Sequence, residues 1–338
     1  MTWVRLSFRQ QRWELILVAI AVAGVVVAMV YLTTTLNGMR AASPDCADFL
    51  RNQGDVGLGP PLACQRAMDA WFSTIGYTSM LQTFALVAPL GMGVFIGAPL
   101  VAREIDGGTA QLAWSLSRSR VGWLLRRIGF VAIFVVALLA TVATASELMA
   151  GATQPDRDLA EDFLYFGRRG LPVVAHGVGA LMLGVLVGAI IGRVMPAVLA
   201  SALVIGIAFA GLSLGQEAWN RGEATIQPSY DETGQPMPFD FSAMNVGYGL
   251  QRPDGRFLTY DEAFESGLPA EFFPDDQGRV YASAEDLEAG RVFGHEVRLV
   301  IVAERYPELV LRDSGLWVLL GVGALGAAAV VVARRRPV

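Results

Sequence analysis

The chain of 338 residues contains no lysine, and all 26 of its basic residues are arginine. Complete use of arginine in place of lysine is typical of a GC-rich bacterial genome of the actinobacterial kind. We interpret it as base-composition bias without functional meaning. Charged residues make up only 17% of the sequence, whereas soluble domains carry roughly 25%. Since 54% of the residues are hydrophobic, the composition argues against an ordinary soluble domain.

Motifs for nucleotide, metal and acyl chemistry are also absent. The sequence has no G-x-x-x-x-G-K-[ST] segment, so the chain does not bind ATP through a P-loop. It has neither an H-E-x-x-H pattern nor a G-x-S-x-G elbow. The only histidines, His176 and His295, are far apart and have no acidic residues at metal-ligand spacing. We therefore expect no metal site, no catalytic residue and no nucleic-acid partner.

The hydrophobic residues are concentrated in six blocks of about twenty residues, the length that crosses a hydrocarbon core of roughly 30 Å. The fourth and fifth blocks are separated only by residues 192–195, which predicts a tight hairpin. The first block is too long for a cleavable signal peptide. We predict an all-α polytopic membrane protein whose six transmembrane helices lie at 14–36, 79–101, 128–146, 171–191, 196–215 and 316–333.

The distribution of arginine predicts how these helices are oriented. One set of connecting segments holds twelve arginines against three acidic residues, and the opposite set holds fourteen arginines against 28 acidic residues. Because basic residues in short loops favour the cytoplasm, we expect both termini to be cytoplasmic in a plasma-membrane protein. The cytoplasmic segments are then 102–127 and the tail 334–338, and the extracellular segments are 37–78, 147–170 and 216–315.

Two of the polar segments have features of their own. Residues 1–13 mix aromatic residues with three arginines, which predicts a short amphipathic helix among the inner lipid headgroups. A basic tail without regular structure is the alternative. Residues 216–315 are long enough to form a small domain. Turn signals, a strand pattern at 297–304 and helical patterns at 261–268 and 283–290 predict a mixed α/β extracellular domain between helices five and six.

Cys46 and Cys64 both fall in the first extracellular segment. That compartment permits a disulfide, and closing a loop of this size would stabilise it by about 3 kcal/mol. Two unpaired thiols are the alternative, but exposed thiols are chemically unstable in an oxidising compartment. We therefore predict a disulfide bond.

Small residues recur at four-residue spacing in the spans, which allows close approach of helix backbones. These candidate interface residues are Gly184, Gly188 and Gly192 in the fourth helix and Gly211 and Gly215 in the fifth. A subunit interface and ordinary packing within one chain both fit the spacing. Five proline and glycine residues between Pro89 and Pro99 predict a kink in the second helix.

A few polar residues lie in or near the spans, where they are costly and often functional. The candidates are Gln82, Glu147 and His176, although simple hydrogen bonding near the outer interface is an alternative. Asp156 and Asp158 form a D-x-D string in the second extracellular segment. Such a pair could hold a divalent cation in a membrane-anchored, lipid-linked sugar transferase, or it could be a solvated acidic loop.

The cytoplasmic segment between the second and third helices has the most specific pattern. It leaves the membrane at Arg103-Glu104 and turns at Gly107-Gly108. Thr109 can cap a short helix at 110–116 through its side-chain oxygen. Such a helix suits docking of a cytoplasmic partner, although an amphipathic re-entry segment without a partner has the same pattern.

This segment resembles the membrane subunits of ABC-2 type ABC transporters. The matching residues are Glu104, Gly108 and Thr109, followed by Ser119, Arg120 and Trp123. The hairpin at Gly192-Arg193 and the approach to the last span at Tyr306-Pro307 are also similar to that family. The extracellular domain departs from the short loops of many family members.

The resemblance implies six helices, a permease role and export of an amphipathic or hydrophobic substrate. It implies a dimer with a second permease copy or a paralogue, and two P-loop ATPase subunits that carry ATP and Mg²⁺. No cofactor is then expected on this chain, which would not be an enzyme itself. An extracellular ligand sensor is a further alternative. The residues implied to couple with the ATPase are Arg103, Glu104, Gly108, Thr109, Leu112, Trp114, Arg118 and Arg120.

Overall fold

The computed structural model describes residues 2–42, 46, 62–115, 117, 119–155, 157–229, 242–252, 254–265 and 295–335. The chain forms two compact units. Unit one comprises Met1–Leu159, Tyr165–Leu212 and Glu308–Val338, and unit two comprises Ala160–Leu164 and Ser213–Pro307.

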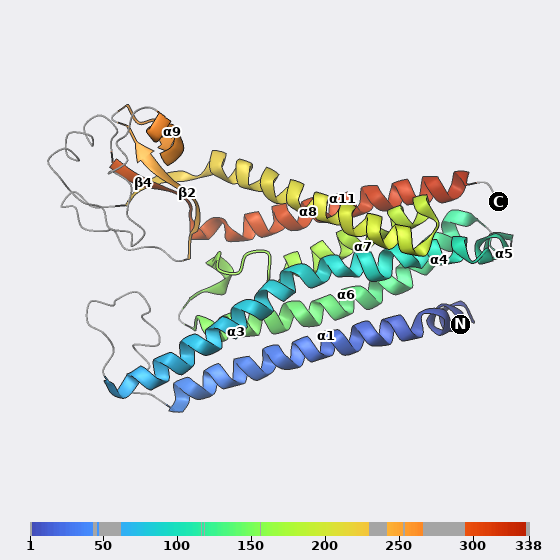
Figure 1. Ribbon diagram of the computed structural model, residues 1–338, viewed down its shortest axis with the longest axis horizontal. Helices are drawn as coiled ribbons and strands as arrows, with labels where there is room; N and C mark the ends of the chain where they lie inside the picture. The colour runs from blue at the N-terminus through green and yellow to red at the C-terminus, as the bar shows by residue number, and fades with distance from the viewer. Residues whose placement is uncertain are drawn as a thin grey trace. The chain divides into compact units, whose positions relative to one another are not determined.

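Six helical stretches are long and apolar enough to cross a membrane, which confirms the predicted number (Figure 1). They are α1 (Thr2–Ala42), a rod formed by α3 (Leu62–Met92), η2 (Gly93–Gly97) and α4 (Ala98–Asp106), then α6 (Arg120–Thr153), α7 (Leu171–Ile191), α8 (Val194–Glu223) and α11 (Tyr306–Arg334). The protein is thus a multi-pass membrane protein.

The helices extend past the borders expected from hydropathy. Residues 2–13 continue α1 without a break, and residues 62–78 already belong to α3. The last helix begins at Tyr306 rather than at Leu316. Hydropathy detects only the apolar middle of a helix, whereas backbone hydrogen bonds continue into its polar ends. Contact of residues 1–13 with lipid headgroups stays a prediction.

Helix α7 lies at the centre of unit one. Of its most apolar stretch, 72% is buried, against 17% for α1 and α8. It packs against α3, η2, α4 and α6. A Cβ atom at Gly184 would lie 2.0 Å from the carbonyl oxygen of Gly93, and one at Gly188 would lie 2.3 Å from that of Ala98. These two glycines therefore serve packing within the chain.

The other candidate interface glycines have different surroundings. Gly192 ends α7 in the left-handed conformation, with φ of 69°, and donates its N–H to Gly188 O at 2.9 Å. Nothing within the chain lies within 4 Å of a Cβ atom placed at Gly211 or Gly215. The expected kink is a π-helical turn, η2, whose glycines allow the close contact with α7.

Unit two contains a four-stranded antiparallel sheet in the order β1-β4-β2-β3. The strands are β1 (Thr225–Pro228), β2 (Met244–Gln251), β3 (Phe257–Thr259) and β4 (His295–Ile301), and α9 (Tyr260–Glu265) follows β3. Leu250, Leu258 and Ala263 form a small core. The strand predicted at 297–304 is confirmed at 297–301, and the helix predicted at 261–268 is confirmed at 261–265, whereas 266–268 and 283–290 lie outside the described residues.

The carboxyl of Glu296 on β4 gives unit two a pH dependence. Burial raises its pKa above the ordinary value. Because the folded state then holds the proton more tightly, stability is highest below the ordinary pKa of about 4.3 and falls as the pH rises through the raised value. We expect Glu296→Gln to increase the protection of β4 amides from hydrogen exchange at pH 7.5, but not at pH 4. Equal effects at both pH values, after correction for intrinsic exchange rates, would contradict this.

Candidate functional site

The segment between the second and third spans forms a compact turn at one end of unit one. Gly107 and Gly108 close α4, with Gly107 N–H bonded to Arg103 O at 2.9 Å and Gly108 at φ of 68°. Helix α5 (Thr109–Ser115) follows and confirms the predicted short helix. Ser119 then caps α6, because its Oγ accepts the N–H of Gly122 at 3.0 Å.

A buried ion pair lies beneath this turn. Arg127 Nη2 of α6 lies 2.9 Å from Glu104 Oε1 of α4, and the side chains are 8% and 7% exposed. The hydroxyl of Thr109 donates to Glu104 Oε2 at 2.6 Å. Thr109 is the first residue of α5, and the expected role of its side-chain oxygen as a cap stays a prediction. Glu104 was expected to couple to a partner, and its burial means that it can do so only through the residues around it.

Aromatic rings link α5 to the neighbouring helices. Trp114 of α5 packs edge to face on Trp123 of α6, with centroids 6.3 Å apart. The Arg120 guanidinium lies 5.0 Å from the Trp114 ring centroid, and its Nη1 donates to Arg335 O at 2.6 Å. The side chains of two other expected coupling residues, Leu112 and Arg118, lie outside the described residues.

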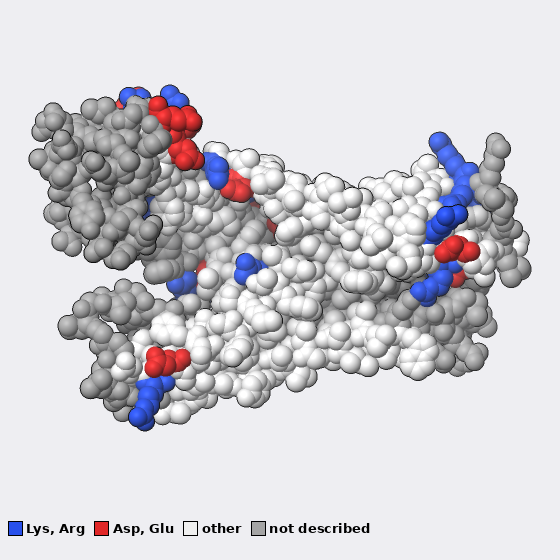
Figure 2. Space-filling model, in the orientation of Figure 1, with Lys and Arg blue, Asp and Glu red and all other residues white. Residues whose placement is uncertain are grey.

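Hydrogen bonds join the same end of the bundle to α7, α8 and α11. The Arg335 guanidinium donates to Ala189 O and Ile190 O at the end of α7. Asp106 Oδ2 accepts the N–H of Val194, the first residue of α8, at 3.3 Å. In Figure 1, α5 lies at this end of the bundle. Figure 2 shows several basic residues on the surface at the same end. The residues next to α5 are therefore bonded to several helices of the bundle.

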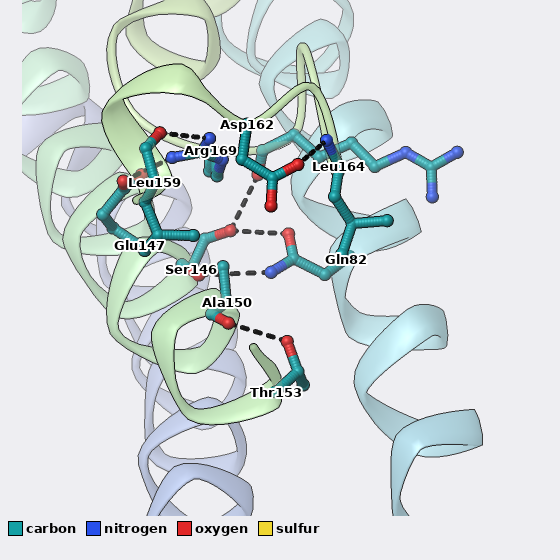
Figure 3. A network of polar contacts seen from close by, with 10 residues as sticks. Gln82, Ser146, Glu147, Ala150, Thr153, Leu159, Asp162, Leu164 and Arg169 are labelled. Atoms are coloured by element: carbon teal, nitrogen blue, oxygen red, sulfur yellow. Dashed lines mark hydrogen bonds and ion pairs between the residues drawn. The ribbon is translucent and has the colours of Figure 1, made fainter. Parts of the chain in front are cut away.

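The opposite end of unit one contains a second polar network (Figure 3). Gln82 Nε2 of α3 donates to Ser146 O of α6 at 3.1 Å, and Ser146 Oγ lies 2.7 Å from Gln82 Oε1. Glu147 Oε1 pairs with Arg169 Nη1 at 2.5 Å, and Arg169 Nη2 donates to Leu159 O at 2.6 Å. Gln82 thus joins α3 to α6, and Glu147 joins α6 to the segment that follows it.

His176 has a partner that the sequence did not indicate. Its Nε2 lies 2.8 Å from Asp313 Oδ2 of α11. Asp313 was assigned to the extracellular domain because it precedes the last apolar block, but it belongs to the buried part of α11. The signal that could have found it is its position three residues before Leu316, within one helical turn of the predicted span.

The cysteine prediction is confirmed, since Cys46 and Cys64 form a disulfide with a Cα–Cα distance of 5.6 Å. The D-x-D string gains no support, because Asp156 lies outside the described residues. Among the residues that are described, no group of three or more His, Cys, Asp or Glu side chains could hold a metal ion.

Comparison with known proteins adds one finding. The family model described as "ABC-2 membrane transporter related" matches residues 17–214, which include the first five helices and the turn around α5. No curated protein and no solved structure matches the chain.

Proposed function

The chain belongs to the ABC-2 membrane transporter related family, and on that premise we propose that it is the permease subunit of an ATP-driven exporter. ATP and Mg²⁺ would be bound by a separate P-loop ATPase, with two ATPase subunits serving two permease copies or a permease and a paralogue. The α5 end of the bundle and both termini would face the cytoplasm, and the four-stranded unit would lie outside the cell.

One observation carries this proposal, namely the way α5 is tied to the bundle. Its Trp114 contacts α6, and its first residue Thr109 bonds to the Glu104–Arg127 pair that joins α4 to α6. Arg120 continues the link to the end of α11. A protein that closes under α5 would therefore move α4, α6 and α11 together, as coupling of ATP hydrolysis to transport requires.

The character of the spans favours one substrate class. The apolar stretches of α3, α7 and α8 are rich in glycine and alanine and carry few charged groups. Ion pathways are commonly lined by rings of backbone carbonyls or of charged side chains, and charged side chains are few in these stretches. We therefore favour an amphipathic or hydrophobic cargo such as a drug, antibiotic, peptide or lipid.

Purification of the full chain from its native membrane in mild detergent tests the proposal. We expect a P-loop ATPase at one copy per permease, with ATPase activity only in the complex. Reproducible purification of the folded chain without an ATPase would count against the permease role.

A substitution on the exposed side of the α5 turn should separate docking from folding. Ser115 is exposed at the end of α5. We expect Ser115→Trp to lower recovery of the ATPase at least tenfold, because the added ring blocks the docking surface, whereas Ser115→Ala, which removes only the hydroxyl, should leave recovery unchanged. Leu214→Trp on exposed α8 is the control and should leave recovery unchanged. Unchanged recovery with Ser115→Trp would place the docking surface elsewhere.

A further inference from the structure

Two exposed arginines belong to helix ends that adjoin one another in unit one. Arg193 lies in the connection between α7 and α8, and Arg334 is the last residue of α11. The next residue, Arg335, holds these ends together, because its guanidinium donates to Ala189 O and Ile190 O at the end of α7. Residues that are far apart in the sequence are thereby brought to the same end of the bundle.

Positive charge is in excess at this end. Seven arginines and only two acidic residues occur in segments 103–106, 120–127, 193 and 334–335. One of the two acids, Glu104, is buried and paired with Arg127. The other, Asp106, accepts the N–H of Val194 at 3.3 Å. A net positive charge therefore remains at this end of the bundle.

The side chains of Arg193 and Arg334 form no ion pair or hydrogen bond with any residue that the structure describes. An anion that approaches this surface thus meets guanidinium groups that no described carboxylate satisfies. Guanidinium groups bind phosphate oxygens through short, charge-assisted hydrogen bonds. The surface therefore favours a phosphate group as its ligand.

An apolar stripe on α8 begins two residues after Arg193. Met195, Leu199, Leu203 and Ile207 follow one another at four-residue spacing and are 63–69% exposed. The stripe rises by about 18 Å along the helix, enough to cover one leaflet of a hydrocarbon core of roughly 30 Å. A free phosphate ion would gain nothing from this stripe, whereas an acyl chain would cover it.

We propose that Arg193 and Arg334 bind the headgroup phosphate of an anionic phospholipid, whose acyl chain lies along the exposed stripe of α8. Arg335 is a positioning residue for this site, because it holds the end of α7 beside the end of α11. An acidic protein surface would match the arginines but not the stripe. The site needs no ATPase, so its test is independent of the permease role.

Native mass spectrometry of the full-length chain in mild detergent, without an ATPase, tests the proposal. The probes are phosphatidylglycerol, which is anionic, and phosphatidylcholine, which has the same acyl chains but no net charge. We expect phosphatidylglycerol to occupy the chain at a concentration about tenfold lower, since two basic residues attract its charge. Equal occupancy by the two lipids would overturn the proposal and leave these arginines to a protein partner.

Competition with inorganic phosphate separates a lipid site from a simple anion site. Phosphate at the same concentration as phosphatidylglycerol should not displace the lipid, because it makes no contact with the apolar stripe. Displacement of the lipid by phosphate would overturn the assignment to a phospholipid.

Neutralising substitutions locate the site. Arg193→Gln and Arg334→Gln should each weaken phosphatidylglycerol binding by about fivefold and leave phosphatidylcholine binding unchanged. Arg126→Gln, at an exposed position of α6 at the same end, removes an equal charge outside the site and should leave binding of both lipids unchanged. An equal loss in all three variants would show a diffuse attraction by net charge and would overturn the proposed site. The comparison of the two lipids on the unmodified chain is decisive if a variant does not fold.

Discussion

Glu104→Ala should destabilise the protein by about 3–5 kcal/mol, because it leaves the Arg127 guanidinium buried without a carboxylate. Arginine cannot lose its proton in a protein, so the charge persists in the variant. The melting temperature in mild detergent should fall accordingly. In the complex with the ATPase, less transport should result from each ATP hydrolysed, because Thr109 loses its bond to the carboxylate that joins α4 to α6, and only the contacts of Trp114 still connect α5 to α6.

A matched control uses another Arg–Glu pair of similar length. Glu217 and Arg221 lie 2.6 Å apart on α8 and are about half exposed. Glu217→Ala should therefore change stability by about 0.5 kcal/mol at most. The double variant Glu104→Leu with Arg127→Leu should recover much of the stability, because no charge remains buried. A fall in stability for Glu104→Ala no larger than for Glu217→Ala would show that the buried pair is unimportant.

Gly184→Ala and Gly188→Ala should each destabilise the fold by about 3 kcal/mol or more, since overpacking against a backbone has little room to relax. The added methyl groups would lie 2.0 Å and 2.3 Å from backbone carbonyl oxygens of η2 and α4. Neither carbonyl can move without displacing a whole helix. Melting temperature and the yield of folded protein in mild detergent measure the effect.

Gly211→Ala on α8 is the matched control. A Cβ atom there meets nothing within 4 Å, and alanine is the better helix former by about 1 kcal/mol. This variant should be as stable as the unmodified chain or slightly more so. If Gly188→Ala were tolerated equally well, the close packing of α7 on α4 would be wrong.

The sequence predicted the elements that depend on local pattern. Apolar blocks of sufficient length revealed six helices, and two cysteines in one segment between predicted spans indicated the disulfide. The Gly107-Gly108 turn and the apolar spacing after it predicted α5. These features arise from residues close together in the chain, so that composition and spacing are enough to find them.

The partners of the buried polar residues could not be predicted in the same way. Arg127 lies 23 positions after Glu104, and Asp313 lies 137 positions after His176. A helical repeat shows which residues share a face, but it does not show which neighbouring helix that face meets. The sequence left both a subunit interface and internal packing open at Gly184 and Gly188 for the same reason, and only the position of η2 and α4 shows the internal packing.

The burial of α7 also bears on how the chain is assembled in the membrane. The glycines of α7 pack against backbone groups of α4 and η2, which are synthesised earlier. This face of α7 is therefore suited to contact with protein rather than with lipid. The tight hairpin at Gly192-Arg193 places α8 directly after α7, and many long apolar side chains of α8 are exposed. During synthesis, α8 can thus contact the lipid while α7 packs against α3, η2, α4 and α6, which belong to spans already made. The last helix, α11, then packs its Trp317 against Gly179 of α7.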